Sequence, residues 1–141
     1  MQKIAVIGAG VMGLATARAL ERRGHDVVVF EQFERDHERG SSHGRSRIFR
    51  LAYAEDEYVR LAQESLGLWR QLEAETGDTL LELNGLLEIV RTLEESTAHT
   101  LEACGVEWHR LDGDEAEQRY PIHVPEGSFA ILQPEAGIVR A

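Results

Sequence analysis

The sequence predicts an α/β fold in which a βαβ unit comes first and a part with antiparallel strands follows. Residues 4–7 form a short apolar run that ends in closely spaced glycines, and the segment after them is rich in helix-forming residues. A second apolar run, residues 27–30, ends at Glu31. These features predict two parallel strands joined by a helix. Beyond Glu31 no further βαβ pattern is clear, so we expect the later strands to pair antiparallel.

The glycines Gly8, Gly10 and Gly13 follow the pattern GxGxxG between the first strand and the helix. This arrangement is typical of a Rossmann-like unit that binds the ADP half of a dinucleotide. Gly8 allows the tight turn, Gly10 lets the backbone approach the pyrophosphate, and Gly13 lets the helix pack on the strand. The amides at the helix N-terminus would face the phosphates. Because 13 of the residues are glycine, a purely structural βαβ unit is the alternative, but the strand and helix context favours binding.

Glu31 narrows the choice of dinucleotide. An acid at the end of the second strand accepts hydrogen bonds from a free ribose diol and repels a 2′-phosphate, which favours FAD or NAD over NADP. These residues leave FAD and NAD both open. Gly24 is placed to end the intervening helix with a positive φ.

Composition excludes several classes of protein. The chain has 141 residues, 43% of them hydrophobic and 28% charged, which is typical of a soluble globular domain. Its net charge of −10 argues against nucleic acid or an anionic membrane as a partner. Cys104 is the only cysteine, so an internal disulfide is excluded. We find no export signal and no metal-binding pattern, and we expect a cytoplasmic protein.

We interpret residues 32–44 as a loop. Periodicity predicts the elements that follow it. A helix is expected from Asp56, its N-cap, to Gly77. Asn84-Gly85 predicts a β-hairpin over residues 80–90 with a type I′ turn. The long helix carries an apolar stripe of Val59, Ala62, Leu66, Trp69 and Leu72. The further expected elements are a helix at 93–104 closed by Gly105, a strand at 106–111, an acidic helix at 112–120 and a strand at 128–132.

Residues 40–53 read GSSHGRSRIFRLAY, and the tail contains QPEAGIV. Together with VIGAGVMG and Glu31, these stretches resemble the FAD-dependent amine oxidases related to D-amino-acid oxidase. The closest branch is that of monomeric sarcosine oxidase and N-methyltryptophan oxidase. The resemblance covers essentially the whole chain but only about the first third of a full-length member. The 40–53 stretch is specific to this branch, and it decides for FAD over NAD.

The resemblance implies a division of the chain. Residues 1–78 would form the Rossmann-like FAD-binding segment, residues 79–132 the start of a substrate-binding domain, and residues 133–141 the return toward the FAD-binding domain. A parallel sheet needs several strands with helices on both faces. The single βαβ unit therefore leaves a compact α+β domain or the N-terminal part of a longer chain. We expect the second, and hence an incomplete fragment that is inactive alone.

The resemblance also implies roles for individual residues. His43 and Arg47 would lie near the flavin as catalytic groups, and Arg50 would bind the substrate carboxylate. The physics agrees, because the planar guanidinium of arginine matches a carboxylate bidentately. Ordinary surface arginines are the alternative, and Tyr53 is assigned to packing with a pocket wall as its alternative. Arg45, Cys104 and Lys3 receive no role. The predicted cofactor contacts are Gly8, Ala9, Gly10, Val11, Met12, Gly13, Glu31, Gln32, Ser41, His43 and Arg47.

The function implied by the resemblance is FAD-dependent oxidation of the C–N bond of a secondary amine or N-methyl amino acid. A hydride equivalent would pass to the flavin, water would hydrolyse the resulting imine, and O2 would reoxidise the flavin to give H2O2. A flavin dehydrogenase that uses an electron carrier and a non-catalytic dinucleotide-binding module are the alternatives. Sarcosine, N-methyltryptophan and other amino acids all remain candidate substrates.

Overall fold

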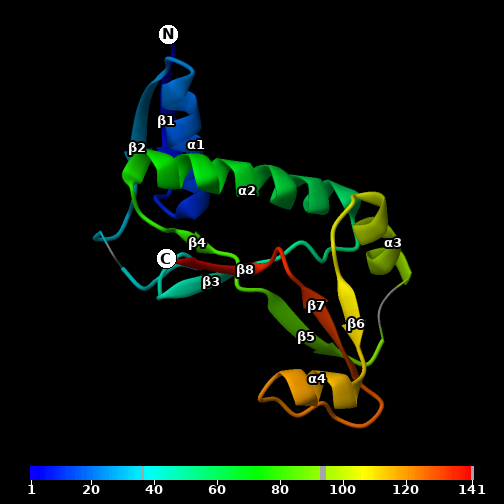
Figure 1. The fold of residues 1–141 in the computed structure, drawn as a ribbon. Coiled ribbons are helices and arrows are strands. Elements are labelled where there is room, and N and C mark those ends of the chain that lie inside the picture. Colours follow the sequence, from blue (N-terminus) through cyan, green and yellow to red (C-terminus); the bar gives the residue numbers. More distant parts are fainter. Residues whose placement is uncertain (36, 93–94, 141) are drawn as a thin grey trace. The chain divides into compact units, whose positions relative to one another are not determined.

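The structure, a computed structural model, describes residues 1–35, 37–92 and 95–140, which divide into two compact units, Met1–Arg45 and Ser46–Arg140 (Figure 1). The first unit consists of β1 (Lys3–Ile7), α1 (Val11–Arg22) and β2 (Asp26–Phe30). The two strands are parallel, with a register that runs from Lys3 opposite Asp26 to Ile7 opposite Phe30. The predicted βαβ unit is therefore confirmed.

The connection from α1 to β2 turns at Gly24, whose φ of 80° lies in the left-handed region. Its N–H donates to the carbonyl of Glu21 at 2.8 Å, so the glycine closes the helix as expected. α1 contains no buried residue. Several large apolar side chains of this unit are more than half exposed, namely Ile7, Val11, Met12, Leu14, Val28 and Phe30.

The second unit contains two antiparallel sheets, of strand order β3-β8-β4 and β5-β7-β6. The antiparallel pairing expected beyond Glu31 is thus confirmed, and the predicted α/β class holds. In chain order its elements are β3 (Ser46–Phe49), α2 (Asp56–Thr76), β4 (Leu81–Glu82), β5 (Leu86–Val90), α3 (Glu95–Ala103), β6 (His109–Leu111), α4 (Gly113–Arg119), β7 (Phe129–Gln133) and β8 (Gly137–Arg140).

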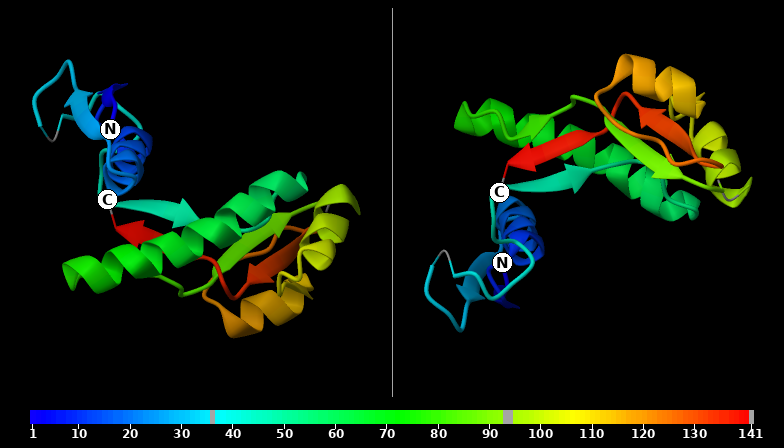
Figure 2. Two further views of the ribbon diagram at one scale, coloured as in Figure 1. Left: turned by 90° about the horizontal axis from the view of Figure 1, so that it is seen from above. Right: turned by 90° about the horizontal axis from the view of Figure 1, so that it is seen from below.

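Helices cover these sheets through two apolar clusters. α2 lies along the β3-β8-β4 sheet (Figures 1 and 2), and its Val59 is fully buried against Leu81 of β4 and Val139 of β8. Ala62, Leu66 and Trp69 pack against the same cluster, which confirms most of the predicted apolar stripe. The second cluster joins α4 to the other sheet and contains Leu111, Ala116, Val124 and Ala130.

The predicted hairpin at residues 80–90 is wrong. β4 pairs with β8, whereas β5 pairs with β7, so the two expected hairpin strands belong to different sheets. At Asn84-Gly85 the chain crosses between the sheets, and the N–H of Gly85 donates to the carbonyl of Ala136 at 2.9 Å. The preference of Asn-Gly for a turn is local. It is outweighed by pairing with β7, a central strand that buries four of its five residues.

Smaller differences concern the element ends. The N-cap of α2 is Glu55, without a side-chain cap, and Asp56 is the first helical residue. Gly77 does end this helix, with φ 76°. β6 is shorter than expected, and no pattern in the sequence predicted β3 or β8. The helix predicted at 93–104 is present as α3, but residues 93 and 94 lie outside the described residues. Within the described part, no helix is long and apolar enough to cross a membrane.

Candidate functional site

The glycine turn between β1 and α1 has the geometry that its sequence predicts. Gly8 adopts φ 98°, and its N–H donates to the carbonyl of Phe30 at 2.7 Å. A Cβ at Gly13 would lie 1.9 Å from the Gly8 carbonyl oxygen, which is far inside any allowed contact. Only glycine therefore lets α1 approach the turn this closely, and the predicted tight turn and close packing are confirmed. Whether these residues hold a cofactor stays a prediction.

A serine hydroxyl lies at the N-terminus of α1. Gly10 is the N-cap in an extended conformation and provides no side-chain cap. Ser42 supplies the missing acceptor, because its Oγ accepts a hydrogen bond from the N–H of Val11 at 3.0 Å. A Cβ at Gly10 would lie 3.1 Å from the same oxygen. The sequence assigned a cofactor contact to the neighbouring Ser41 and missed Ser42, since only the folded loop shows which hydroxyl reaches the helix.

Glu31 is held by backbone amides at the end of β2. Its Oε2 accepts from the N–H of Ala9 at 2.9 Å, and its Oε1 accepts from Gln32 at 2.8 Å and from Phe33 at 3.1 Å. The hydrogen bond from Ala9, followed by that from Phe33, holds the pKa of the Glu31 carboxyl below its ordinary value. His37 Nε2 also lies 3.5 Å from Oε1. Because each carboxylate oxygen has about two lone-pair sites, Oε2, which accepts the Ala9 hydrogen bond, keeps capacity for one further donor.

His43 and Arg47, the predicted catalytic residues, belong to different units. His43 is exposed in the first unit, and its Nδ1 forms a hydrogen bond with the carbonyl of Gly40. Arg47 is half-buried on β3 in the second unit, and its guanidinium donates to the carbonyl of Ser46 at 2.6 Å. The structure thus gathers the glycine turn, Glu31 and Ser42 in one unit, and Arg47 and Arg50 in the other. The roles of His43 and Arg47 stay predictions.

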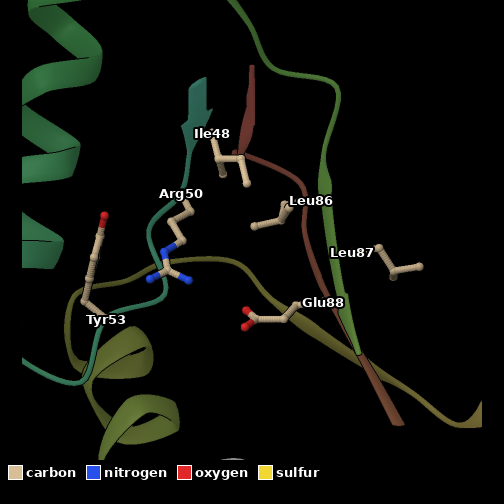
Figure 3. A pocket seen from close by; sticks show the side chains of 6 residues that line it. All are labelled: Ile48, Arg50, Tyr53, Leu86, Leu87 and Glu88. Atoms are coloured by element: carbon tan, nitrogen blue, oxygen red, sulfur yellow. The ribbon is translucent and has the colours of Figure 1, made fainter. Parts of the chain in front are cut away.

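Arg50 lies in an open pocket of about 360 Å³ in the second unit (Figure 3). Its guanidinium carbon lies 5.1 Å from the centre of the Tyr53 ring, within the range of a cation–π contact. Tyr53 packs against the first apolar cluster, as expected, and it also contributes to the pocket wall, the alternative that the sequence left open. Glu88 of β5 brings an acid to the same pocket, and the sequence missed it. The lining residues are Ile48, Arg50, Tyr53, Leu86, Leu87 and Glu88.

Gln133 anchors the segment that follows Arg50. Its Oε1 accepts from the N–H of Leu51 at 3.2 Å and from that of Ala52 at 3.0 Å, and the side chain is fully buried at the end of β7. More than eighty residues separate the partners in sequence. No local pattern predicts such a contact, and no role was predicted for Gln133 from the sequence.

Comparison with known families matches residues 3–141 to DAO, the FAD dependent oxidoreductases. The chain belongs to this family. Peroxisomal sarcosine oxidase of Homo sapiens is 40% identical, and the match covers 96% of this chain and 36% of that protein. Monomeric sarcosine oxidase of Bacillus sp. (strain B-0618) is 36% identical, with the same coverage. The chain thus spans little more than a third of the length of these relatives.

A solved structure of NikD, described as an unusual amino acid oxidase essential for nikkomycin biosynthesis, has a similar fold. Its TM-score is 0.81 at 31% identity, over 99% of this chain and 38% of NikD. Membership of the DAO family confirms the resemblance predicted from residues 40–53 and from the glycine motif. It also confirms FAD, and not NAD, as the cofactor of this oxidoreductase family.

Proposed function

We propose that this DAO family protein oxidises the C–N bond of a secondary amine or N-methyl amino acid, with FAD as the electron acceptor and O2 as the final oxidant. The observation that carries the proposal is the position of the Arg50 guanidinium, which lies in a pocket large enough for a small molecule. The sarcosine oxidase names of several relatives support the same substrate class. Cytoplasmic location stays a prediction, and the human relative is named as peroxisomal.

The first unit fits the ADP part of FAD. Gly13 permits a close helix approach that any Cβ would prevent, so the amides at the start of α1 can face a pyrophosphate. The first of these amides, that of Val11, already donates to the Ser42 hydroxyl, so a hydrogen-bond acceptor has room at this end of the helix. Glu31, ionised and fixed by three amides, would accept a hydrogen bond from a ribose hydroxyl.

The second unit would hold the substrate. Arg50 would bind its carboxylate through two parallel N–H···O bonds, and stacking on Tyr53 would keep the guanidinium in place. FAD, when bound, would accept the hydride equivalent from the carbon next to the amine nitrogen, so that the C–N bond becomes the C=N bond of an imine. Fixing the carboxylate orients the neighbouring amine carbon, which lowers the entropic part of the barrier.

The substitution Arg50→Ala in the full-length protein loaded with FAD tests this function. The KM for sarcosine and other carboxylate substrates should rise at least about tenfold, because a charge-assisted pair is lost. The flavin absorbance should remain, since Arg50 is proposed to hold substrate and not FAD. H2O2 release, measured with a peroxidase-coupled assay, tells whether oxygen or an electron carrier is the final electron acceptor.

Arg60→Ala provides the matched control. Arg60 is an exposed arginine of α2 that pairs with Asp56 at 3.4 Å and does not line the pocket, so its loss should leave KM unchanged. Equal KM values for the Arg50→Ala and unaltered proteins would remove Arg50 from the substrate site. Bound FAD without oxidation of any amine would instead favour the dinucleotide-binding module.

A further inference from the structure

The pocket around Arg50 contains a second charge that the proposed chemistry does not use. In Figure 3 the carboxylate of Glu88 and the guanidinium of Arg50 point into the same hollow from two different segments. Leu86 and Glu88 are two residues apart on β5 and therefore share a face, whereas Leu87 points away. Ile48 of β3 closes the hollow with a second aliphatic side chain. The hollow is thus bounded by one cationic and one anionic side chain, by two aliphatic side chains and by the ring of Tyr53.

Glu88 would weaken the binding of a ligand whose only charged group is a carboxylate. A carboxylate bound at Arg50 would lie in the same small pocket as the Glu88 carboxylate, and like charges repel. The strand neighbour of Glu88 is Ile131 of β7, which is buried and apolar and offers no compensating charge. A positive group on the ligand would remove this cost. It would also gain a charge-assisted hydrogen bond.

The reacting nitrogen is a poor candidate for that positive group. An amine must carry its lone pair to give up a hydride equivalent from the adjacent carbon, and a carboxylate partner would stabilise the protonated, unreactive form. We therefore infer that Glu88 recognises a second cationic group, and that the substrates are N-methyl or related amino acids with a positively charged side chain. This inference rests on the proposed function, and it makes Glu88 a specificity-determining residue.

The dimensions of the pocket agree with such a ligand. A volume of about 360 Å³ lies at the lower end of the range for small-molecule sites, roughly 300–1,000 Å³. The aliphatic side chains of Ile48 and Leu86 would cover the methylene groups that separate the two charges of the ligand. Arg50 would take the carboxylate and Glu88 the distal cation.

Two matched substrates test the inference in the full-length, FAD-loaded protein. Nα-methyl-lysine and Nα-methyl-norleucine share the carboxylate, the methylated amine and the four-carbon side chain, and differ only in the terminal ammonium group. The unaltered protein should show a kcat/KM at least about tenfold higher for the lysine compound, mainly through KM, as expected for one charge-assisted hydrogen bond. Glu88→Gln should reduce this ratio to about one.

Glu102→Gln is the control for loss of a negative charge. Glu102 is exposed on α3 and does not line the pocket, so this variant should keep the preference for the lysine compound. A ratio near one in the unaltered protein would overturn the inference without any variant. A preference that survives in Glu88→Gln would overturn it as well.

The proposed function and the inference can fail separately. Oxidation of both compounds at equal efficiency contradicts the role of Glu88 and leaves amine oxidation standing. If neither compound bleaches the flavin, the proposed oxidation of this substrate class fails, and calorimetric binding of the two compounds then decides about Glu88. Tighter binding of the lysine compound that is lost in Glu88→Gln supports the inference, and equal binding of the two overturns it.

Discussion

The Gln133 side chain shows how a single residue can fix the geometry of a distant segment. Its Oε1 satisfies two backbone amides, those of Leu51 and Ala52, directly after Arg50. Its own Nε2 is buried and has no hydrogen-bond partner in the described part of the chain. Burying an unpaired polar group is unfavourable, so the two hydrogen bonds to Oε1 must offset the cost of the buried Nε2.

Gln133→Leu should destabilise the protein and weaken substrate binding together. Because two amides would lose their acceptor, the free energy of unfolding, measured by urea titration, should fall by about 2–4 kcal/mol. The KM for carboxylate substrates should also rise, because the segment that carries Arg50 loses its anchor. Gln118→Leu, at an exposed position of α4, is the control and should change stability by less than about 0.5 kcal/mol. Equal stability of the two variants would contradict the anchoring role.

The glycines and Glu31 of the first unit could be identified from the sequence because their relationship is local. Gly8, Gly10, Gly13 and Glu31 belong to one βαβ unit, where spacing along the chain determines spacing in the fold. Ser42, Glu88 and Gln133 differ in this respect. Each acts on a segment that lies far away in sequence, so no pattern around these residues reveals their contacts.

Among the elements, α2 is joined to β4 by one acid. Glu73 Oε1 accepts from the N–H groups of Leu80 and Leu81, both at 2.8 Å, and its Oε2 pairs with Arg70 at 2.6 Å. Arg70 also donates to the carbonyl of Leu81 at 2.9 Å. The Leu81 amide, then the Arg70 side chain, lowers the pKa of Glu73 from 4.5 to about 2.

The lowered pKa predicts how stability depends on acid. In the unfolded chain Glu73 takes up a proton near pH 4.5, whereas in the folded protein it does so only near pH 2. The stabilisation that Glu73 contributes should be complete above pH 4.5 and should be lost as the pH falls to about 2. Urea titrations across this window should therefore give a smaller acid-induced loss for Glu73→Gln than for the unaltered protein. Glu64→Gln, at an exposed position of α2, should follow the unaltered protein, and identical slopes for all three would contradict the prediction.

At the scale of the whole molecule, the two sheets of the second unit are formed by two segments that both bend between the sheets. At the bend the N–H of Gly85 on one segment donates to the carbonyl of Ala136 on the other at 2.9 Å. β4 and β5 come from one segment, and β8 and β7 from the other. Leu81 pairs with Val139 in one sheet, and Leu86 pairs with Gln133 in the other. Leu81 and Leu86 are five residues apart in sequence, whereas their partners are six residues apart. The extra residue falls at the turn over residues 134–135, where the N–H of Ala136 donates to the carbonyl of Gln133 at 3.3 Å. This bend allows one pair of segments to contribute to two sheets.

Gly137 is the residue that the bend requires. A Cβ at this position would lie 1.9 Å from the carbonyl oxygen of Glu82 and 2.9 Å from the Cα of Leu83, so the backbone would have to move. Gly137→Ala should lower the free energy of unfolding by about 2 kcal/mol or more. Gly67→Ala is the opposite control, because a Cβ at this position of α2 would meet open space. Alanine there should raise the free energy of unfolding by about 0.5–1 kcal/mol. Thermal unfolding of both variants measures the contrast, and a stable Gly137→Ala protein would contradict it.

The sequence by itself determined the βαβ unit, its glycine turn, the apolar stripe of α2 and, through residues 40–53, the family. These features depend on periodicity and spacing within short segments, which the chain encodes directly. Only the tertiary structure decided that Asn84-Gly85 crosses between two sheets instead of closing a hairpin. It also decided that Glu88 shares a pocket with Arg50. The physical reason is that strand pairing is settled by burial across the whole unit, which outweighs the preference of any one turn.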